Sequence, residues 1–235
     1  MEMLKAYVFR ANTRPEDCKR YIEAHLNTLR SFGVNEISSI DPIWLKNPDV
    51  FIMILEESES GEIIAGGRLQ FLHDDVPLPV ESAIGSIDPR IHEIVRRESY
   101  QPICEYCGLW SSKKYASYGV GSMLLMRMGI ALLTIVGASS CIAFISPAIY
   151  KNCLKIGFRH VEELKNEGVF YYPTPEFKSR VLLINDPVEL ESASKEERIR
   201  IFELRSKPIQ LYEEAGIRGK ILVEYNLTLN RELQT

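Results

Sequence analysis

A carboxylate inside an apolar segment is the first residue of this sequence with the chemistry of a catalyst. Residues 103–111 (ICEYCGLWS) have the pattern of a buried strand, and Glu105 is the charged residue within them. Alternation along a strand predicts that Glu105 shares a face with Cys107 and Leu109. Burial would raise the pKa of Glu105 toward the range of a general base, and the alternative is a structural ion pair or an edge position facing water.

Two glycines precede the most apolar part of the chain. Gly119 and Gly121 stand in a turn that leads into a predicted helix at residues 120–136. Unpaired N–H groups at the start of a helix, together with the helix dipole, favour bound anions. The turn is therefore a candidate anion site, and the alternative is an ordinary connection between a strand and a helix.

Tyr150 and Cys153 are candidate proton donors one turn apart on a second predicted helix, which starts at Ser146-Pro147. A phenol with a pKa of about 10, or a thiol with a pKa of about 8.5, can protonate a departing thiolate. Core packing is the alternative for both residues. Trp110 and Tyr118 could likewise line a channel or pack in the core.

Cys104 and Cys107 form a C-x-x-C pair. A zinc site would need a second pair, and Cys141 and Cys153 have the wrong spacing for one. On a strand, Cys104 and Cys107 would point to opposite faces, which opposes both chelation and a disulfide. Buried structural cysteines are the favoured interpretation.

The elements that must position these residues alternate between strands and helices. We predict residues 1–186 as a main domain and residues 187–235 as a C-terminal appendage of helix and strand. Within the appendage, a helix is expected up to about residue 206, with 211–215 continuing as helix and 220–229 as a strand. The main domain is expected to have strands at 4–12, 50–55, 63–72, 103–111, 141–145, 158–163, 169–172 and 181–185, and helices at 13–32, 91–97, 120–136 and 147–157.

One part of the chain resembles the central motifs of the GNAT superfamily of acyl-CoA-dependent N-acyltransferases. Its order is a strand, a glycine turn, an apolar helix, a second strand, and a helix that ends in Gly157-Phe158. The residues that carry the resemblance are Leu109-Trp110-Ser111, Ala116 to Gly121, 141–145 and Cys153 to Phe158. It extends over about residues 4–185. The resemblance implies an α/β (α+β) fold with a mixed, largely antiparallel sheet flanked by helices.

The resemblance also implies an activity, which is acyl transfer from a thioester to an amine, with acetyl-CoA or another acyl-CoA as co-substrate. Glu105 would be the base, and Tyr150 or Cys153 the acid. The coenzyme would be bound by Leu109, Trp110, Ser111, Ala116, Ser117, Tyr118, Gly119, Val120, Gly121, Ser122 and Ser146.

Three positions depart from the family pattern. Ala116 stands where the family usually has Arg or Gln, Cys153 where it often has Tyr, and Ser146 where Asn often opens the last helix. The departures at 116 and 153 favour one alternative, a non-catalytic module that binds acyl-CoA. Gly66-Gly67-Arg68-Leu69 favours another, a long-chain N-acyl amino acid synthase or acyl-homoserine-lactone-type synthase that uses acyl-CoA or an acyl carrier protein.

Composition limits the remaining classes. The 235 residues are 46% hydrophobic and 26% charged, and the formal net charge is −4, so a core can form and general nucleic-acid binding is not expected. The apolar residues 120–136 are too short and too interrupted for a membrane span. Five cysteines without an apolar leader favour a cytoplasmic protein with reduced thiols. The amine acceptor, small molecule or peptide, is not specified, and a homodimer stays open.

Overall fold

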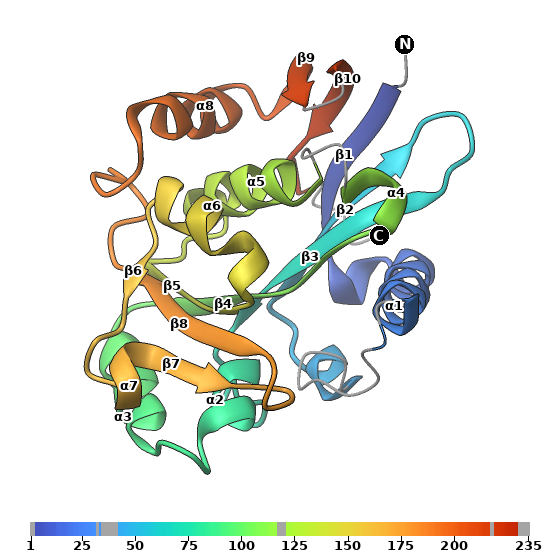
Figure 1. The fold of residues 1–235 in the computed structure, drawn as a ribbon. Coiled ribbons are helices and arrows are strands. Elements are labelled where there is room, and N and C mark those ends of the chain that lie inside the picture. Colours follow the sequence, from blue (N-terminus) through green and yellow to red (C-terminus); the bar gives the residue numbers. More distant parts are fainter. Residues whose placement is uncertain (1–2, 32, 34–41, 117–120, 217–218, 230–235) are drawn as a thin grey trace.

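A single mixed sheet of ten strands runs through the molecule (Figure 1). The structure, a computed structural model, describes residues 3–31, 33, 42–116, 121–216 and 219–229. The strands are β1 (Met3–Arg10), β2 (Val50–Glu57), β3 (Ile63–Phe71), β4 (Ile103–Ser111), β5 (Ser140–Ile145), β6 (Arg159–His160), β7 (Val169–Tyr171), β8 (Lys178–Ile184), β9 (Ile209–Gly216) and β10 (Gly219–Asn226). Their order in the sheet is β6-β8-β5-β4-β3-β2-β1-β10-β9, and β7 pairs with β8.

Helices cover both faces of the sheet (Figure 1). They are α1 (Pro15–Ser31), α2 (Pro79–Ile84), α3 (Arg90–Glu98), α4 (Lys113–Ala116), α5 (Gly121–Ile135), α6 (Tyr150–Lys155), the short turn α7 (Lys165–Gly168) and α8 (Lys195–Ser206), with 3-10 turns η1 (Ala11–Thr13), η3 (Pro42–Lys46) and η4 (Pro147–Ile149). The helices α5, α6 and α8 pack on one face, and α1, α2 and α3 on the other.

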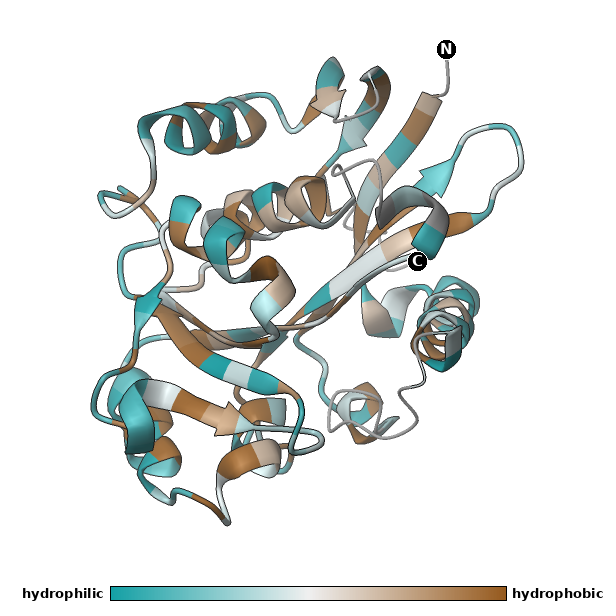
Figure 2. Ribbon diagram, in the orientation of Figure 1, coloured by the Kyte–Doolittle hydropathy of each residue, from teal (hydrophilic) through white to brown (hydrophobic). Residues whose placement is uncertain are grey.

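Most strand pairs are antiparallel, and β4–β5 and β1–β10 are parallel. The prediction of a mixed, largely antiparallel sheet flanked by helices is therefore confirmed. The apolar residues gather on α5 and the inner strands, whereas α8 is largely hydrophilic (Figure 2). Leu124, Leu125, Ile130 and Leu132 of α5 are at most 1% exposed, which explains why this helix is apolar on all sides.

The prediction of helix at residues 211–215 is wrong, because they belong to the strand β9. Every second side chain of this strand contacts Arg200 of α8, as Gln210, Tyr212 and Glu214 do. These contacts help to hold the segment in an extended conformation. β9 and β10 form a hairpin that pairs with β1, so the C-terminal residues complete one side of the sheet.

Candidate active site

A cavity passes through the sheet where the parallel strands β4 and β5 separate. These strands pair at three positions only, from Ile103–Ser140 to Glu105–Ile142. Beyond them lies a cavity of about 260 Å³, with lining residues from both faces of the sheet. Glu105, Cys107, His25, Leu29 and Phe144 line it on the α1 side, and Tyr106, Leu109, Met126, Ala143, Cys153 and Phe158 on the α5 side.

A bulge at Gly108 shapes the β4 side of this cavity. Gly108 has a φ of +57°, and the pairing of β3 with β4 shifts between Gly66 and Arg68. A Cβ at position 108 would lie 2.8 Å from the hydroxyl of Tyr21, which donates a hydrogen bond to the Gly108 carbonyl at 3.0 Å. Glycine is therefore required both for the backbone angle and for the close approach.

The bulge changes which residues share a face. A Cβ on Gly67 would meet Leu109 and Tyr106, whereas Glu105 and Cys107 lie opposite Gln70 and Arg68. The prediction that Leu109 shares a face with Glu105 is therefore wrong. The extra residue at the bulge turns Leu109 toward α5, where it lines the apolar part of the cavity.

Glu105 is buried at the α1 end of the cavity. It is 2% exposed, and its Oε2 accepts a hydrogen bond from the N–H of Val80 at 2.7 Å. Burial raises the pKa of Glu105 to about 8, although the Val80 hydrogen bond and the nearby Arg68 act in the opposite direction. A carboxylate with such a pKa can accept a proton at neutral to mildly basic pH. Its role as the base stays a prediction.

Polar and aromatic side chains surround Glu105 on this side of the sheet. His25 of α1 stacks on Trp110 with ring centroids 6.0 Å apart, and burial, with help from Arg68, lowers the pKa of His25 to about 3. His25 is therefore a neutral ring at neutral pH. Arg68 is 1% exposed and lies over the ring of Trp44 at 4.5 Å. Of these groups, His25 lines the α1 end of the cavity together with Glu105.

The α5 end of the cavity is apolar, and it includes one of the candidate acids. Cys153 is buried, with its sulfur 3.7 Å from the sulfur of Met126. Burial raises the pKa of Cys153 to about 12. Because the conjugate acid of a thiolate has a pKa near 8.5, a thiol of this kind is a poor proton donor to it. The thiol therefore does not have the ordinary pKa expected from the sequence, and the role of Cys153 as the acid stays a prediction.

Tyr150, the other candidate acid, does not line the cavity in the described part of the chain. Its hydroxyl forms a hydrogen bond of 2.7 Å with Nε2 of His160, and Arg180 lies over its ring. Ile149 and Cys153 of the same segment do reach the cavity. The structure therefore brings Glu105 and Cys153 to one cavity and directs Tyr150 elsewhere.

The predicted coenzyme residues divide into several groups. Ser117, Tyr118, Gly119 and Val120 lie outside the described residues, Ala116 ends α4, and Gly121 and Ser122 begin α5. Leu109 and Ser146 line the cavity, and Ser146 has the N-cap position of η4 without a capping bond from its hydroxyl. Trp110 is buried on the α1 side against His25, away from the start of α5.

The start of α5 packs closely on the end of β4. A Cβ at Gly121 would lie 2.6 Å from Oγ of Ser111, which is buried and has no hydrogen-bond partner among the described residues. Coenzyme binding at the start of this 15-residue helix stays a prediction. A Cβ at residue 121 would meet Ser111, so a substitution there would disturb packing in any case.

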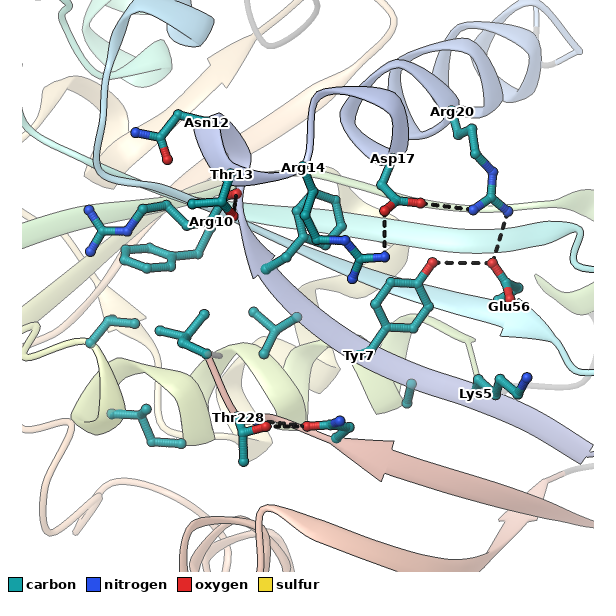
Figure 3. A pocket seen from close by; sticks show the side chains of 18 of the residues that line it. Lys5, Tyr7, Arg10, Asn12, Thr13, Arg14, Asp17, Arg20, Glu56 and Thr228 are labelled. Carbon is teal, nitrogen blue, oxygen red and sulfur yellow. Dashed lines mark hydrogen bonds and ion pairs between the residues drawn. The ribbon is translucent and has the colours of Figure 1, made fainter. Parts of the chain in front are cut away.

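A larger hollow of about 1770 Å³ lies at the other parallel pair, where β1 and β10 separate (Figure 3). Four of its charged side chains, Arg14, Asp17, Arg20 and Glu56, form ion pairs with one another. Arg20 bonds Asp17 at 3.0 Å and Glu56 at 2.9 Å, Tyr7 donates to Glu56 at 3.1 Å, and Arg14 pairs with Asp17. This open hollow lacks the buried carboxyl that distinguishes the β4–β5 cavity.

The cysteines do not form disulfides with one another. All five are buried and unpaired, and Cys104 faces α5 whereas Cys107 faces α1. In the part of the chain that the structure describes, no three His, Cys, Asp or Glu side chains form a group suited to a metal ion. No described helix is long and apolar enough to cross a membrane.

Comparisons with known proteins define the fold. No family model matches the sequence, and no curated protein is similar to it. Solved structures are similar: FeeM, an N-acyl amino acid synthase from uncultured soil microbes, has a TM-score of 0.61 at 14% identity, over 85% of this chain and 99% of its own. TofI, in a ternary complex with an inhibitor and MTA, has a TM-score of 0.55 at 11% identity, over 83% and 96%.

An acyl-CoA N-acyltransferase from Pseudomonas aeruginosa is also similar, with a TM-score of 0.50 at 14% identity, over 77% of this chain and 99% of its own. At such identities the likeness concerns the fold. The chain has the fold of the GNAT-type acyltransferases, as the resemblance of residues 103–158 implied.

Three residues that line the cavity were not predicted from the sequence. His25, Met126 and Ala143 come from α1, α5 and β5, and no local pattern distinguishes them from core residues. Gly108 did carry a signal, since an isolated glycine in a strand indicates a bulge.

Proposed function

We propose that this chain is an N-acyltransferase that moves a medium- or long-chain acyl group from a CoA thioester to a small amine. The observation that carries the proposal is the cavity through the sheet, which has an apolar end at α5 and a buried carboxyl, Glu105, at the α1 end. An acyl group suits the first end and a polar amine suits the second.

The proposed reaction uses few residues of this chain. The amine nitrogen attacks the thioester carbonyl carbon, a C–N bond forms, the C–S bond breaks, and the thiolate leaves. Glu105 accepts the proton that the amine releases. Past Glu105, β4 pairs with no residue of β5, so peptide N–H groups of β4 at the gap can donate to the developing oxyanion. A thiolate is already a fair leaving group, so no protein acid is required.

The volume of the cavity supports an acyl chain longer than acetyl. Its 260 Å³ corresponds to several molecules of water, each of which occupies about 30 Å³ in the liquid. Met126, Phe158 and Ile149 supply apolar walls for methylene groups. The likeness to FeeM, an N-acyl amino acid synthase, supports the same choice of reaction. An acetyl donor is the alternative, and it would leave most of the cavity unfilled.

Calorimetric titration with acyl-CoAs of increasing chain length tests the proposal. Each buried methylene contributes about 0.8 kcal/mol, or roughly a fourfold lower Kd, until the cavity is filled. Ala143→Val fills part of the cavity from β5, and we expect it to weaken long-chain binding while acetyl-CoA binding stays unchanged. Equal affinity for every chain length, in both proteins, would exclude an acyl site in this cavity.

A further inference from the structure

The lining of the β4–β5 cavity carries little charge. Among the lining residues that the structure describes, Glu105 is the only Asp, Glu, Lys or Arg. The hydroxyl of Ser179 donates to the carbonyl of Tyr172 at 3.0 Å, and His25 is uncharged because burial and Arg68 lower its pKa to about 3. A bound molecule can therefore pair one charged group with the protein, and a second charge would be buried without a partner.

Aromatic side chains lie on the same face of the sheet as Glu105. In the parallel pair of β4 and β5, Glu105 is paired with Ile142, and Phe144 follows Ile142 two residues later on the same face. The ring of Phe144 packs against that of Tyr172, with centroids 5.4 Å apart, and both residues line the cavity. An aromatic wall therefore begins next to the carboxyl.

The ring of Phe144 is covered only in part by the protein. β5 is an inner strand, between β4 and β8, and the neighbours of Phe144 along it, Ala143 and Ile145, are 2% and 6% exposed. Phe144 itself is only half-buried. An apolar ring on an inner strand that keeps accessible surface beside a cavity is suited to contact a ligand.

We propose that the acceptor of the acyl transfer is an aromatic monoamine, that is, a primary amine that carries an aromatic ring and has no carboxylate or second amine. The inference rests on the proposed function and specifies its substrate class. The amino group is the one polar part of such a molecule and meets Glu105, and the ring lies against Phe144 and Tyr172. The nitrogen attacks the thioester carbon, a C–N bond forms, Glu105 takes the proton that the nitrogen releases, and the C–S bond breaks as CoA leaves as the thiolate.

The charges of the cavity exclude two common kinds of amine. The carboxylate of an amino acid would lack a cation, because no described Lys or Arg lines the cavity. The second ammonium group of a diamine would lack a carboxylate, because Glu105 is already engaged by the first. Both kinds of molecule would give up water around a charge that the cavity does not pair.

Initial rates with four amines and one saturating long-chain acyl-CoA test the proposal. The kcat/KM for phenylethylamine should be about a hundredfold or more above that for phenylalanine, which adds a carboxylate, and above that for diaminobutane, which has a second amine in place of the ring. It should be at least about tenfold above that for ethylamine, which lacks the ring.

Two variants test the aromatic wall. Phe144→Leu removes the ring and keeps an apolar side chain, so it should lower the preference for phenylethylamine over ethylamine at least about fivefold and leave the Kd of the acyl-CoA unchanged. Phe170→Leu is the matched control and should keep the preference of the wild type. Phe170 packs against Phe144 at 6.2 Å, is 4% exposed and is not among the residues that line the cavity. Thermal unfolding checks that both variants are folded.

Equal kcat/KM for phenylethylamine and for phenylalanine or diaminobutane overturns the proposal. So does a preference that Phe144→Leu leaves unchanged, or one that Phe170→Leu lowers equally. Calorimetry with the acyl-CoA separates this claim from the proposed function. A wild type that binds the acyl-CoA without preferring the aromatic monoamine contradicts the substrate class alone, whereas one that binds no acyl-CoA contradicts the proposed function as well.

Discussion

Glu105 combines burial with a position at the meeting point of two different environments. The apolar end of the cavity suits an acyl chain, whereas Glu105 and His25 make the other end polar. A buried carboxyl whose pKa lies near 8 exchanges its proton within the pH range in which amines also titrate. That property follows from the fold, because burial between β4 and α2 is its main cause.

The raised pKa of Glu105 predicts a dependence of stability on pH. The folded state holds the Glu105 proton up to about pH 8, whereas the unfolded state loses it near the ordinary value of 4.5. The contribution of this group to the free energy of unfolding therefore falls as pH rises from 4.5 to 8, by roughly 3–5 kcal/mol. Glu105→Gln removes that loss and can still accept the hydrogen bond from Val80.

Thermal unfolding of both proteins at several pH values measures this effect. The Tm of Glu105→Gln should exceed that of the wild type most clearly above pH 8, and the two should converge near pH 4.5. A difference that is constant across this range would mean that Glu105 is ionised in the folded protein.

At the level of elements, the bulge of β4 is the device that opens the cavity. In Gly108→Ala, the alanine would have a left-handed backbone angle and its Cβ would collide with the Tyr21 hydroxyl. We expect the free energy of unfolding to fall by about 2 kcal/mol or more. Gly61→Ala is the matched control. Gly61 also has a positive φ, of +70°, but a Cβ there would meet nothing within 4 Å.

Chemical denaturation of the two variants separates strain from packing. The free energy of unfolding of the control should fall by about 1 kcal/mol, the cost of a left-handed alanine alone. That of Gly108→Ala should fall clearly further, and this variant should also lose acyl-transfer activity. Equal losses in the two variants would show that the contact between Gly108 and Tyr21 has no role in holding the bulge.

The sequence predicted most of these elements, and its failures have physical reasons. The central order from β4 to α6 was predictable because short apolar segments alternate there with glycine and Ser-Pro signals. The strand β9 was not, because Glu213 and Glu214 suggest a helix, whereas pairing with β10 and contacts with Arg200 of α8 fix the extended form. Of the residues that line the cavity, Glu105 was predicted from the sequence. His25 and Ala143 were not, because they lie far apart in the chain and only the packing of α1 and β5 brings them to the cavity.

At the level of the molecule, a buried ionic network joins the C-terminal residues to the core. Glu214 of β9 is 3% exposed and accepts bonds from Arg127 of α5 at 2.8 Å, from Arg200 of α8 at 3.0 Å and from Tyr225 of β10 at 2.7 Å. The helix α5 thus holds both the proposed coenzyme site and the contact with residues 187–235.

Glu214→Ala tests whether the chain unfolds as one unit. It leaves the buried guanidinium group of Arg200 and the partly buried one of Arg127 without this carboxylate, so the free energy of unfolding should fall by about 3–5 kcal/mol. Glu213→Ala, at an exposed pair with Lys220, should cost less than about 1 kcal/mol. Calorimetry should show a single transition in each case. An early separate transition in Glu214→Ala would support a division between residues 1–186 and 187–235.

The pH dependence of acyl transfer tests the central claim most directly. With a primary amine and a saturating acyl-CoA, kcat of the wild type should rise with pH through a midpoint of about 8, since only ionised Glu105 accepts the proton of the amine. Glu105→Gln should bind the acyl-CoA with the same Kd, should turn over about a hundredfold more slowly, and should lack that midpoint. A variant that keeps both the rate and the midpoint of the wild type would contradict the assignment of Glu105 as the base.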